Sequence, residues 1–453
     1  MARPNAVFVC GSCGGETLKW QGQCPLCGEW NTLEQRLPAS VRVGPSGAPA
    51  VAVALSAGVR LAAATERWAS GTGELDRVLG GGIVPGSVIL LGGDPGIGKS
   101  TLLLQLAAHV AASRPVLYAS GEESVAQVAL RAQRLGLAPD ALGVVAETDL
   151  APILALAAER RVAVLVIDSI QTVQCGGAGV GAGAVSQLRE CTQQLVRFAK
   201  EGGTAVIIIG HVTKEGMIAG PRLLEHLVDT VLYFESEAGS RFRIVRATKN
   251  RFGAANELGF FAMTASGLRE VRNPAAIFLA RAPVPAPGSI VTVTRDGGRP
   301  LLIELQALVD RMRFGAPRRV AQGLDANRLA MLLAAANRHA ALSLQEHDVF
   351  VNVVGGIEIT ETCWDLPVLI ALASSLRDRP VPGELVAFGE IGLTGEVRPV
   401  PYGDERLREA QAQGFNRAII PQGNAPRRTP PGLALVAVSR IEEALEAALG
   451  PAR

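Results

Sequence analysis

The stretch Gly93-Asp-Pro-Gly-Ile-Gly-Lys-Ser100 decides the fold of the central part of this chain. It matches the pattern G-x-x-x-x-G-K-[S/T], in which a glycine-rich loop joins a buried strand to a helix. The apolar run at 88–91 suits such a strand, and the helix-forming residues at 101–108 suit such a helix. The stretch and its context therefore predict a phosphate-binding P-loop.

Each part of this loop has an expected chemical task. The glycines allow backbone N–H groups to turn toward the phosphates of a nucleotide, and the helix opening at Lys99 directs its positive end at the same charges. We expect the Lys99 ammonium to reach the phosphates and the Ser100 hydroxyl to hold Mg²⁺. The expected nucleotide-binding residues are Gly93, Asp94, Pro95, Gly96, Ile97, Gly98, Lys99, Ser100 and Thr101.

Apolar stretches alternate with helical stretches after the loop, at 116–120, 162–167, 205–209 and 231–234. This alternation predicts an α/β domain with a mostly parallel sheet covered by helices on both faces. Asp168 directly follows one of these stretches, at the sheet edge where the P-loop also lies. It is expected to bind Mg²⁺, in the manner of a Walker-B carboxylate; the alternative is an ordinary turn residue.

Two acidic residues, Glu122 and Glu123, follow the strand at 116–120 almost directly. One of them could polarise the water that attacks the γ-phosphate; Glu122 is the preferred catalytic candidate and Glu123 the second choice. The alternative is a helix N-terminus, which favours acidic residues without any catalytic role. His211, at the end of the strand at 205–209, could sense the phosphate.

Two glycine-containing loops are expected at the same sheet edge, at 176–183 and 211–222. The second carries Lys214 and Arg222, whose charges could bind DNA phosphates and respond to the nucleotide. The alternative is that both are ordinary surface loops.

Lys249 and Arg251 are two positions apart in Lys249-Asn-Arg-Phe-Gly253, so in an extended segment they point the same way. Two cations projected from the edge of a subunit suit insertion into the nucleotide site of a neighbouring subunit, which implies a ring. The alternative is a solvated basic hairpin.

The N-terminal region contains Cys10-Gly-Ser-Cys13 and Cys24-Pro-Leu-Cys27. Two such pairs can complete a closed tetrahedral Zn²⁺ site, which would be structural. A redox pair would need only one C-x-x-C, and a reducing compartment disfavours disulfides. Trp20 and Trp30 are expected to cover the small module, with stacking on a nucleic-acid base as the alternative. Cys175 and Cys191 have no partner spacing and are interpreted as ordinary residues.

The whole sequence has 453 residues, 48% of them apolar, and a net charge of +2, so any nucleic-acid surface must be a local patch. It lacks an apolar run of the roughly 18 residues that a membrane span requires, which predicts a cytoplasmic protein with no membrane partner. We expect a zinc finger at 1–36, a linker at 37–60, an ATPase domain at 61–273 and a separate α+β domain at 274–453 with its core at 348–453.

Six motifs occur in order: the cysteine pairs, the P-loop, Ser120-Gly-Glu-Glu-Ser124, Gly210-His-Val-Thr-Lys-Glu-Gly216, Lys249-Asn-Arg-Phe-Gly253 and Phe388-Gly-Glu-Ile-Gly-Leu-Thr-Gly395. Together they resemble the RadA (Sms) family of bacterial DNA repair proteins over essentially the whole chain. The resemblance implies a RecA-like ATPase core, a zinc finger and a C-terminal domain similar to the protease domain of Lon. It also implies a hexameric ring around single-stranded and branched DNA, working with the RecA recombinase in branch migration. Lys249 and Arg251 then resemble the Lys and Arg fingers of DnaB-type helicases.

The Lon-like part departs from the Lon pattern at both catalytic positions. By alignment with Lon, Cys363 stands where the serine nucleophile belongs and Asp404 where the lysine belongs. An aspartate raises rather than lowers the pKa of a thiol, so proteolysis is not expected. The domain is interpreted as an assembly and DNA-binding platform, which agrees with a basic loop at its entrance. The expected DNA contacts in that loop are Arg311, Arg313, Arg318 and Arg319.

The sequence thus favours an ATP-driven DNA motor that requires ATP, Mg²⁺ and Zn²⁺. One alternative is a non-motor module whose assembly ATP switches. A second, less favoured alternative is an ATP-dependent protease.

Overall fold

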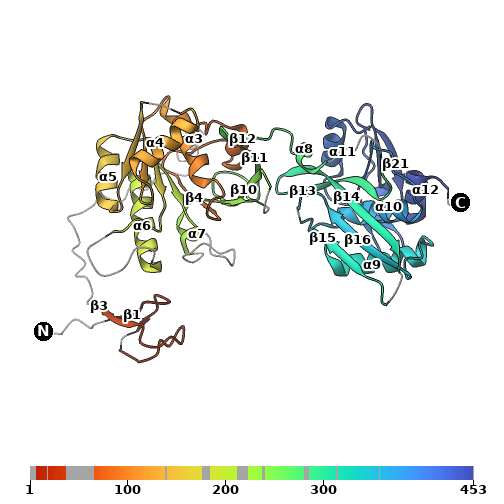
Figure 1. The fold of residues 1–453 in the computed structure, drawn as a ribbon, viewed down its shortest axis with the longest axis horizontal. Coiled ribbons are helices and arrows are strands. Elements are labelled where there is room, and N and C mark those ends of the chain that lie inside the picture. The colour runs from red at the N-terminus through yellow and green to blue at the C-terminus, as the bar shows by residue number, and fades with distance from the viewer. Residues whose placement is uncertain are drawn as a thin grey trace. The chain divides into compact units, whose positions relative to one another are not determined.

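The computed structural model describes residues 7–17, 19–36, 66–137, 140–175, 184–211, 223–236, 240–279, 285–312, 315–356 and 358–451. The chain forms two compact units (Figure 1). The first contains Met1–Glu235, Ile244–Ala255 and Met263–Arg269, and the second contains Ser236–Arg243, Asn256–Ala262 and Glu270–Arg453. Among the described helices, none combines the length and apolarity needed to span a membrane.

The N-terminal residues fold into a three-stranded antiparallel sheet in the order β2-β1-β3. Its strands are β1 (Val7–Cys10), β2 (Glu16–Thr17) and β3 (Leu33–Arg36). Cys10, Cys24 and Leu33 fill its interior, with Phe8 packed against them. Trp20 and Trp30 keep 58% and 66% of their surface exposed, so the expectation that they cover the module is wrong. The sulfurs and Leu33 already occupy the small core.

A nine-stranded sheet, in the order β12-β11-β10-β9-β4-β8-β7-β5-β6, carries the P-loop. The six strands from β9 to β6 are parallel, and β10 is antiparallel to β9. Every residue of β4, β5, β7 and β8 is buried, as expected for parallel strands covered on both faces. The strands are β4 (Val88–Gly93), β5 (Val116–Ser120), β6 (Leu142–Ala146), β7 (Val164–Asp168), β8 (Ala205–Ile209), β9 (Thr230–Glu235), β10 (Phe242–Asn250), β11 (Leu258–Thr264) and β12 (Gly267–Glu270).

Helices of the first unit pack on both faces of this sheet (Figure 1). α3 contacts β5 and β7, whereas α6 contacts β8 and β4. The register pairs Ser120 with Asp168 and Leu91 with Ile209, so the ends of β4, β5, β7 and β8 meet at one edge. The helices are α2 (Gly73–Val78), α3 (Lys99–Ala111), α4 (Val125–Arg134), α5 (Leu150–Glu159), α6 (Val185–Gly202) and α7 (Leu223–Leu227).

The second unit is built on a seven-stranded mixed sheet in the order β15-β16-β14-β13-β17-β20-β21. Its strands are β13 (Ser289–Asp296), β14 (Arg299–Arg311), β15 (Arg319–Gln322), β16 (His347–Val353), β17 (Leu385–Ala387), β20 (Arg417–Pro421) and β21 (Ala434–Val438), while β18 (Glu390–Ile391) and β19 (Val397–Arg398) pair separately. The sheet therefore begins at Ser289, well before residue 348, where the sequence places the start of the core.

Helix α10 (Asp365–Leu376) forms the centre of the second unit, packed on β13 and β14 and contacting α9 and α12. Ten successive residues of α10, at 365–374, are buried, which leaves no solvent-facing side over that span. The remaining helices are α8 (Ala275–Phe278), α9 (Ala326–His339), α11 (Gly403–Ala412) and α12 (Ile441–Leu449), with short 3₁₀ turns at Thr362–Trp364 and Gln422–Asn424.

Candidate functional site

The stretch at 93–100 connects the end of β4 to the start of α3, where the sequence predicts a P-loop. Gly98 has a φ of 116°, and a Cβ at this position would lie 2.7 Å from Cε of Met263. Gly93 has a φ of 152°, and its Cβ would lie 2.6 Å from the Phe234 carbonyl oxygen. A side chain at either position would be both strained and obstructed, so the loop path requires glycine.

Helix α3 begins without a side-chain cap at its N-terminus. Its first backbone N–H groups therefore have no capping side chain and are suited to bind an anion. Lys99, the first residue of α3, is buried, and its Nζ donates to the carbonyl oxygens of Gly93 at 2.7 Å and Asp94 at 2.8 Å. Burial lowers the pKa of Lys99, while the negative charges of Asp168, Glu122 and Asp94 act in the opposite direction.

Asp168 ends β7 and is buried at the same edge of the sheet. The hydroxyl of Tyr118, a fully buried residue of β5, donates to Oδ2 of Asp168 at 2.5 Å. Burial and the neighbouring Asp168 carboxylate raise the pKa of Tyr118, so the phenol keeps its proton and remains a donor. No sequence motif singles out Tyr118. The available signal was a hydroxyl inside an otherwise apolar strand, because a buried tyrosine hydroxyl usually has a partner.

The Glu122 carboxylate contacts two hydrogen-bonding side chains, one just after β7 and one just after β8. Ser169 Oγ donates to its Oε1 at 2.5 Å, and His211 Nε2 lies 3.1 Å from the same oxygen. Burial by itself would raise the pKa of Glu122, but the hydrogen bonds from Ser169 and His211 and the charges of His211 and Lys99 outweigh it, so the pKa is lowered. The carboxylate is thereby kept ionised and fixed in direction.

Glu123 points to a different environment. Its carboxylate forms an ion pair with Arg131 of α4, and its backbone N–H donates to Ser120 Oγ at 3.0 Å. The two adjacent glutamates therefore have separate partners, and only Glu122 contacts residues that follow β7 and β8. The geometry favours Glu122 over Glu123 as the general base.

Two further polar residues belong to the hydrogen-bond network of Glu122 and His211 and were missed from the sequence. Ser169 donates to Glu122 directly, and Gln171 donates from Nε2 to the His211 carbonyl oxygen at 3.5 Å. Within the described part of the chain, Gln171 Oε1 and His211 Nδ1 are buried without a hydrogen-bond partner. His211 thus contacts the candidate base, a position compatible with the expected phosphate sensor. Lys214, Arg222 and the loop at 176–183 lie outside the described residues.

Lys249 and Arg251 lie near the amino ends of the parallel strands, whereas the P-loop of their own chain lies at the carboxyl ends. The register pairs Lys249 with Val231 at the start of β9, whereas Gly93 pairs with Phe234 near its end. Lys249 Nζ donates to the carbonyl oxygens of Glu225 at 2.6 Å and Val228 at 2.8 Å. Burial and the nearby Arg251 charge lower the pKa of Lys249.

Arg251 is half exposed and forms an ion pair with Asp229 at 3.0 Å. Asp229 is itself anchored, because its other carboxylate oxygen accepts from the Val88 N–H at 3.1 Å. Both cations are thus held together at one surface edge by contacts of their own chain. The sequence motifs do not identify Asp229 as the partner of Arg251.

The four N-terminal cysteines converge in space. Their sulfurs all lie within 4.8 Å of one another, with Cys10 and Cys27 at 3.6 Å and Cys13 and Cys24 at 3.6 Å. A tetrahedral zinc site with Zn–S bonds of about 2.3 Å separates its sulfurs by about 3.8 Å, so the cluster fits Zn²⁺. A single redox C-x-x-C would not require the second pair at this distance.

The Lon-like segment places Cys363 in the interior instead of at a catalytic surface. Its side chain is fully buried and donates from Sγ to Glu361 Oε1 at 3.2 Å. Burial and the Glu361 charge raise the pKa of Cys363, which suppresses the thiolate. Glu361 in turn forms a partly buried ion pair with the buried Arg406 at 2.6 Å. This network explains the residue types at 361, 363 and 406 without catalysis.

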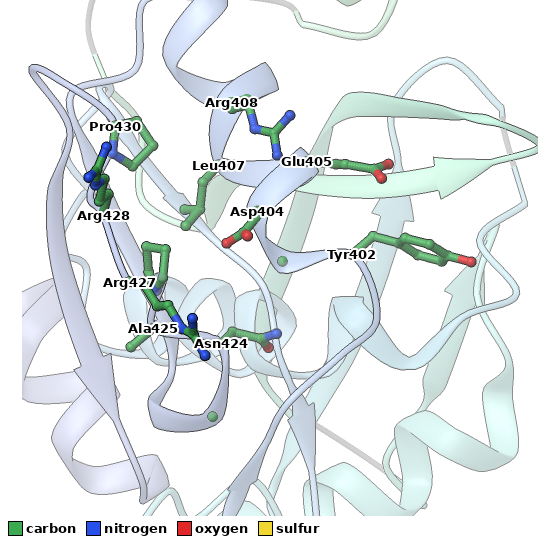
Figure 2. Close-up of a pocket in the computed structure, with 13 residues that line it drawn as sticks. Tyr402, Asp404, Glu405, Leu407, Arg408, Asn424, Ala425, Arg427, Arg428 and Pro430 are labelled. Atoms are coloured by element: carbon green, nitrogen blue, oxygen red, sulfur yellow. The ribbon is translucent and has the colours of Figure 1, made fainter.

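Asp404 lies at the start of α11 and lines an open pocket of about 850 Å³ (Figure 2). Arg408, Arg427 and Arg428 line the same pocket, and Cys363 does not. The aligned positions of a Lon dyad therefore face different surroundings in this chain.

The arginines of the expected DNA-binding loop differ in whether their side chains are exposed or are bonded within their own domain. Arg319 donates to the carbonyl oxygens of Arg318 at 2.9 Å and Leu344 at 2.7 Å, so its guanidinium supports its own domain. Arg318 is 75% exposed and lies 3.9 Å from Asp348. Arg311 is exposed at the end of β14, and Arg313 lies outside the described residues.

Three family models match separate parts of the chain. The AAA domain matches residues 59–217, the rubredoxin metal binding domain matches residues 8–35, and subunit ChlI of Mg-chelatase matches residues 328–424. Fold and site together define a RecA-like P-loop ATPase with an N-terminal four-cysteine zinc ribbon and a C-terminal Lon-like domain.

Curated relatives identify the family within this class. The DNA repair protein RadA of Pseudomonas aeruginosa is 53% identical over 99% of both chains, that of Escherichia coli is 50% identical over 98% of both, and that of Bacillus subtilis is 47% identical over 99% of this chain and 100% of its own. This chain belongs to the RadA family of DNA repair proteins. Among solved structures, the KaiC-like protein PH0186 of Pyrococcus horikoshii aligns with 46% of this chain and 99% of its own, at 19% identity and a TM-score of 0.38.

Proposed function

We propose that this chain is a DNA-dependent, helicase-type ATPase that drives branch migration of recombination intermediates in the cytoplasm, together with a RecA-type recombinase. The observation that carries the hydrolytic part is the fixed Glu122 carboxylate, held by Ser169 and His211 at the sheet edge that carries Lys99. The DNA repair part rests on family membership.

In the proposed mechanism, residues 93–101 hold ATP, with N–H groups and Lys99 on its phosphates. The Ser100 hydroxyl and the Asp168 carboxylate would hold Mg²⁺, and Tyr118 fixes the orientation of the Asp168 carboxylate by donating to its Oδ2. When bound, Mg²⁺ supplies positive charge to the phosphates. Glu122 accepts a proton from the attacking water, and its lowered pKa keeps it in the basic form.

Lys249 and Arg251 are proposed to complete the nucleotide site of a neighbouring copy in a hexameric ring. Support comes from their place at the sheet edge away from their own P-loop. Cations at that edge are poorly placed to stabilise the transition state in the same chain. A ring of identical copies would bring this edge to the next P-loop.

DNA binding is proposed for the loops at 176–183 and 211–222, with Lys214 and Arg222, and for the basic segment with Arg311, Arg313 and Arg318. The contacts of Arg319 with backbone carbonyls assign it a supporting role. We also propose the organisation into a zinc finger at 1–36, an ATPase domain at 61–273 and a Lon-like domain at 274–453. The buried Cys363 argues against proteolysis by the last of these.

Steady-state ATP hydrolysis with and without single-stranded DNA tests this proposal, with Lys99→Ala as the blank. We expect stimulation by DNA that falls steeply as salt is added, because phosphate contacts release counterions. A hydrolysis rate that ignores DNA would contradict the motor and favour the ATP-switched assembly module.

A further inference from the structure

Two cysteines outside the zinc ribbon meet in the interior of the first unit. Cys175 lies beyond the end of β7, and Cys191 lies on α6, 16 positions later. The Cys191 thiol donates to the Cys175 sulfur with the two Sγ atoms 2.7 Å apart. Both residues are free thiols. The interpretation of these cysteines as ordinary residues without a partner is therefore wrong, because the fold, and not a short spacing, brings them together.

The surrounding structure holds both sulfurs in place. Gln187, one turn before Cys191 on α6, donates to the Cys175 carbonyl oxygen at 3.3 Å. The preceding residue Gln174 is anchored on both sides of its backbone, by Thr148 at 2.7 Å and by Leu150 at 2.9 Å. The contact thus joins two elements that are each fixed to the sheet core.

A disulfide requires an S–S separation of about 2.05 Å, so the two sulfurs, 2.7 Å apart, need to approach by only about 0.7 Å. The remaining cysteine of the described core, Cys363, belongs to the second unit and contacts Glu361. Cys175 and Cys191 are therefore a matched pair.

We propose that Cys175 and Cys191 form an oxidative modification site, at which a small hydroperoxide converts the two thiols into a reversible disulfide. This inference goes beyond the proposed function and does not depend on ATP hydrolysis or DNA binding.

The geometry assigns a role to each thiol. Cys175 retains 6% of its surface exposed, whereas Cys191 is fully buried, so the oxidant reaches Cys175 first. Burial raises the pKa of Cys175, while the hydrogen bond from the Cys191 thiol acts in the opposite direction, toward the nucleophilic thiolate. Cys175 is the attacking cysteine, and Cys191 resolves the product.

The chemistry balances without any other reactant. The Cys175 thiolate, having lost its proton to water, attacks a peroxide oxygen; the O–O bond breaks and an alcohol leaves after taking up a proton. Cys191 sulfur then attacks the resulting sulfenic acid, an S–S bond forms, and hydroxide leaves as water with the Cys191 proton. The two thiols lose two electrons, and the hydroperoxide gains them.

The test uses the full zinc-loaded chain treated with hydrogen peroxide, then blocked with N-ethylmaleimide in denaturant and digested for mass spectrometry. We expect a peptide pair joined through Cys175 and Cys191 that separates on reduction, while the Cys363 peptide carries the blocking label. The unmodified chain suffices for this readout, so no variant has to fold. The proposal would be overturned if both thiols still reacted with N-ethylmaleimide after the peroxide treatment. It would also be overturned if either cysteine formed disulfides with Cys363 as readily as with the other.

Two variants test the assigned order. In Cys191→Ser, Cys175 should stop at sulfenic acid and be captured by dimedone, whereas Cys175→Ser should yield little dimedone product at position 191. The reverse pattern would contradict the assigned roles. The oxidised chain should also melt at a higher temperature than the reduced chain, because the cross-link restricts the unfolded state. A lower melting temperature on oxidation would mean that the native geometry does not accommodate the bond, and would count against the site.

Discussion

Glu122 and Glu123 are adjacent in the chain, but their carboxylates meet different partners. Glu122 contacts Ser169 and His211, while Glu123 is paired with Arg131. Their functions should differ accordingly. A residue that only provides a favourable charge at a helix start would be replaceable, whereas a general base would not.

We expect Glu122→Gln to lower the ATP hydrolysis rate by roughly 10²–10⁴-fold, because the amide cannot accept the proton of water. Nucleotide binding should persist, since the P-loop is untouched. Glu123→Gln is the matched control and should retain hydrolysis, with a modest loss of stability from the broken ion pair with Arg131. Equal losses in the two variants, measured by steady-state hydrolysis and nucleotide binding, would contradict the assignment.

Tyr118→Phe removes the hydroxyl that donates to Asp168 and leaves the ring in place. We expect the Mg²⁺ concentration for half-maximal hydrolysis to rise about 10-fold, as for other groups that orient a metal ligand. The stabilisation of the chain against heat by Mg²⁺ and nucleotide should shrink in parallel.

Tyr233→Phe serves as the control for this change, because the Tyr233 hydroxyl bonds Glu225 at 2.9 Å instead of the Asp168 carboxylate. Its Mg²⁺ requirement should match that of the unmodified chain. If Tyr118→Phe and the unmodified chain have the same Mg²⁺ dependence, Tyr118 does not position Asp168.

Among the elements, the strands of the parallel sheet are the most predictable from sequence. The runs at 116–120 and 205–209 coincide with β5 and β8, because strands buried on both faces are continuously apolar and end at polar or glycine residues. By contrast, the β13–β14 hairpin was not used to define the second core. Its Gly297-Gly298 turn, between the paired residues Asp296 and Arg299, was the available signal.

Some site residues could likewise be predicted from local sequence, and others could not. Local motifs point to the P-loop, Asp168 and the glutamates, since each follows an apolar run. Tyr118, Ser169 and Asp229 were missed because their roles depend on partners far along the chain, such as Asp229 with Arg251. Pairing between distant segments is set by the fold, and a single sequence does not display it.

Arg251 directly follows β10 and allows a test of the proposal that neighbouring copies share a nucleotide site. We expect Arg251→Ala to lose roughly 10³–10⁵-fold in hydrolysis, as for other arginine fingers, while it still binds nucleotide. Mixed with Glu122→Gln, it should regain part of the activity, because a ring then contains sites with an intact base and an intact neighbouring cation. Mixtures as inactive as either variant alone would contradict a contribution in trans.

For the whole molecule, the three parts identified by family models combine a closed metal cluster, a nucleotide-hydrolysing core and a Lon-like unit with a buried cysteine. Within the described residues, only the middle part brings the proposed base, the proposed metal-binding carboxylate and a P-loop together at one edge. The other two parts are therefore proposed to direct this motor to DNA and partners, not to add a second reaction.

Movement of a DNA branch point tests the central claim most directly. Deproteinised recombination intermediates, prepared with a RecA-type recombinase, are mixed with the full chain and ATP, and strand products are followed in time. We predict ATP-dependent branch movement with the unmodified chain and none with Lys99→Ala or Glu122→Gln. Hydrolysis stimulated by DNA but accompanied by no branch movement would contradict the motor and leave a nucleotide switch in its place.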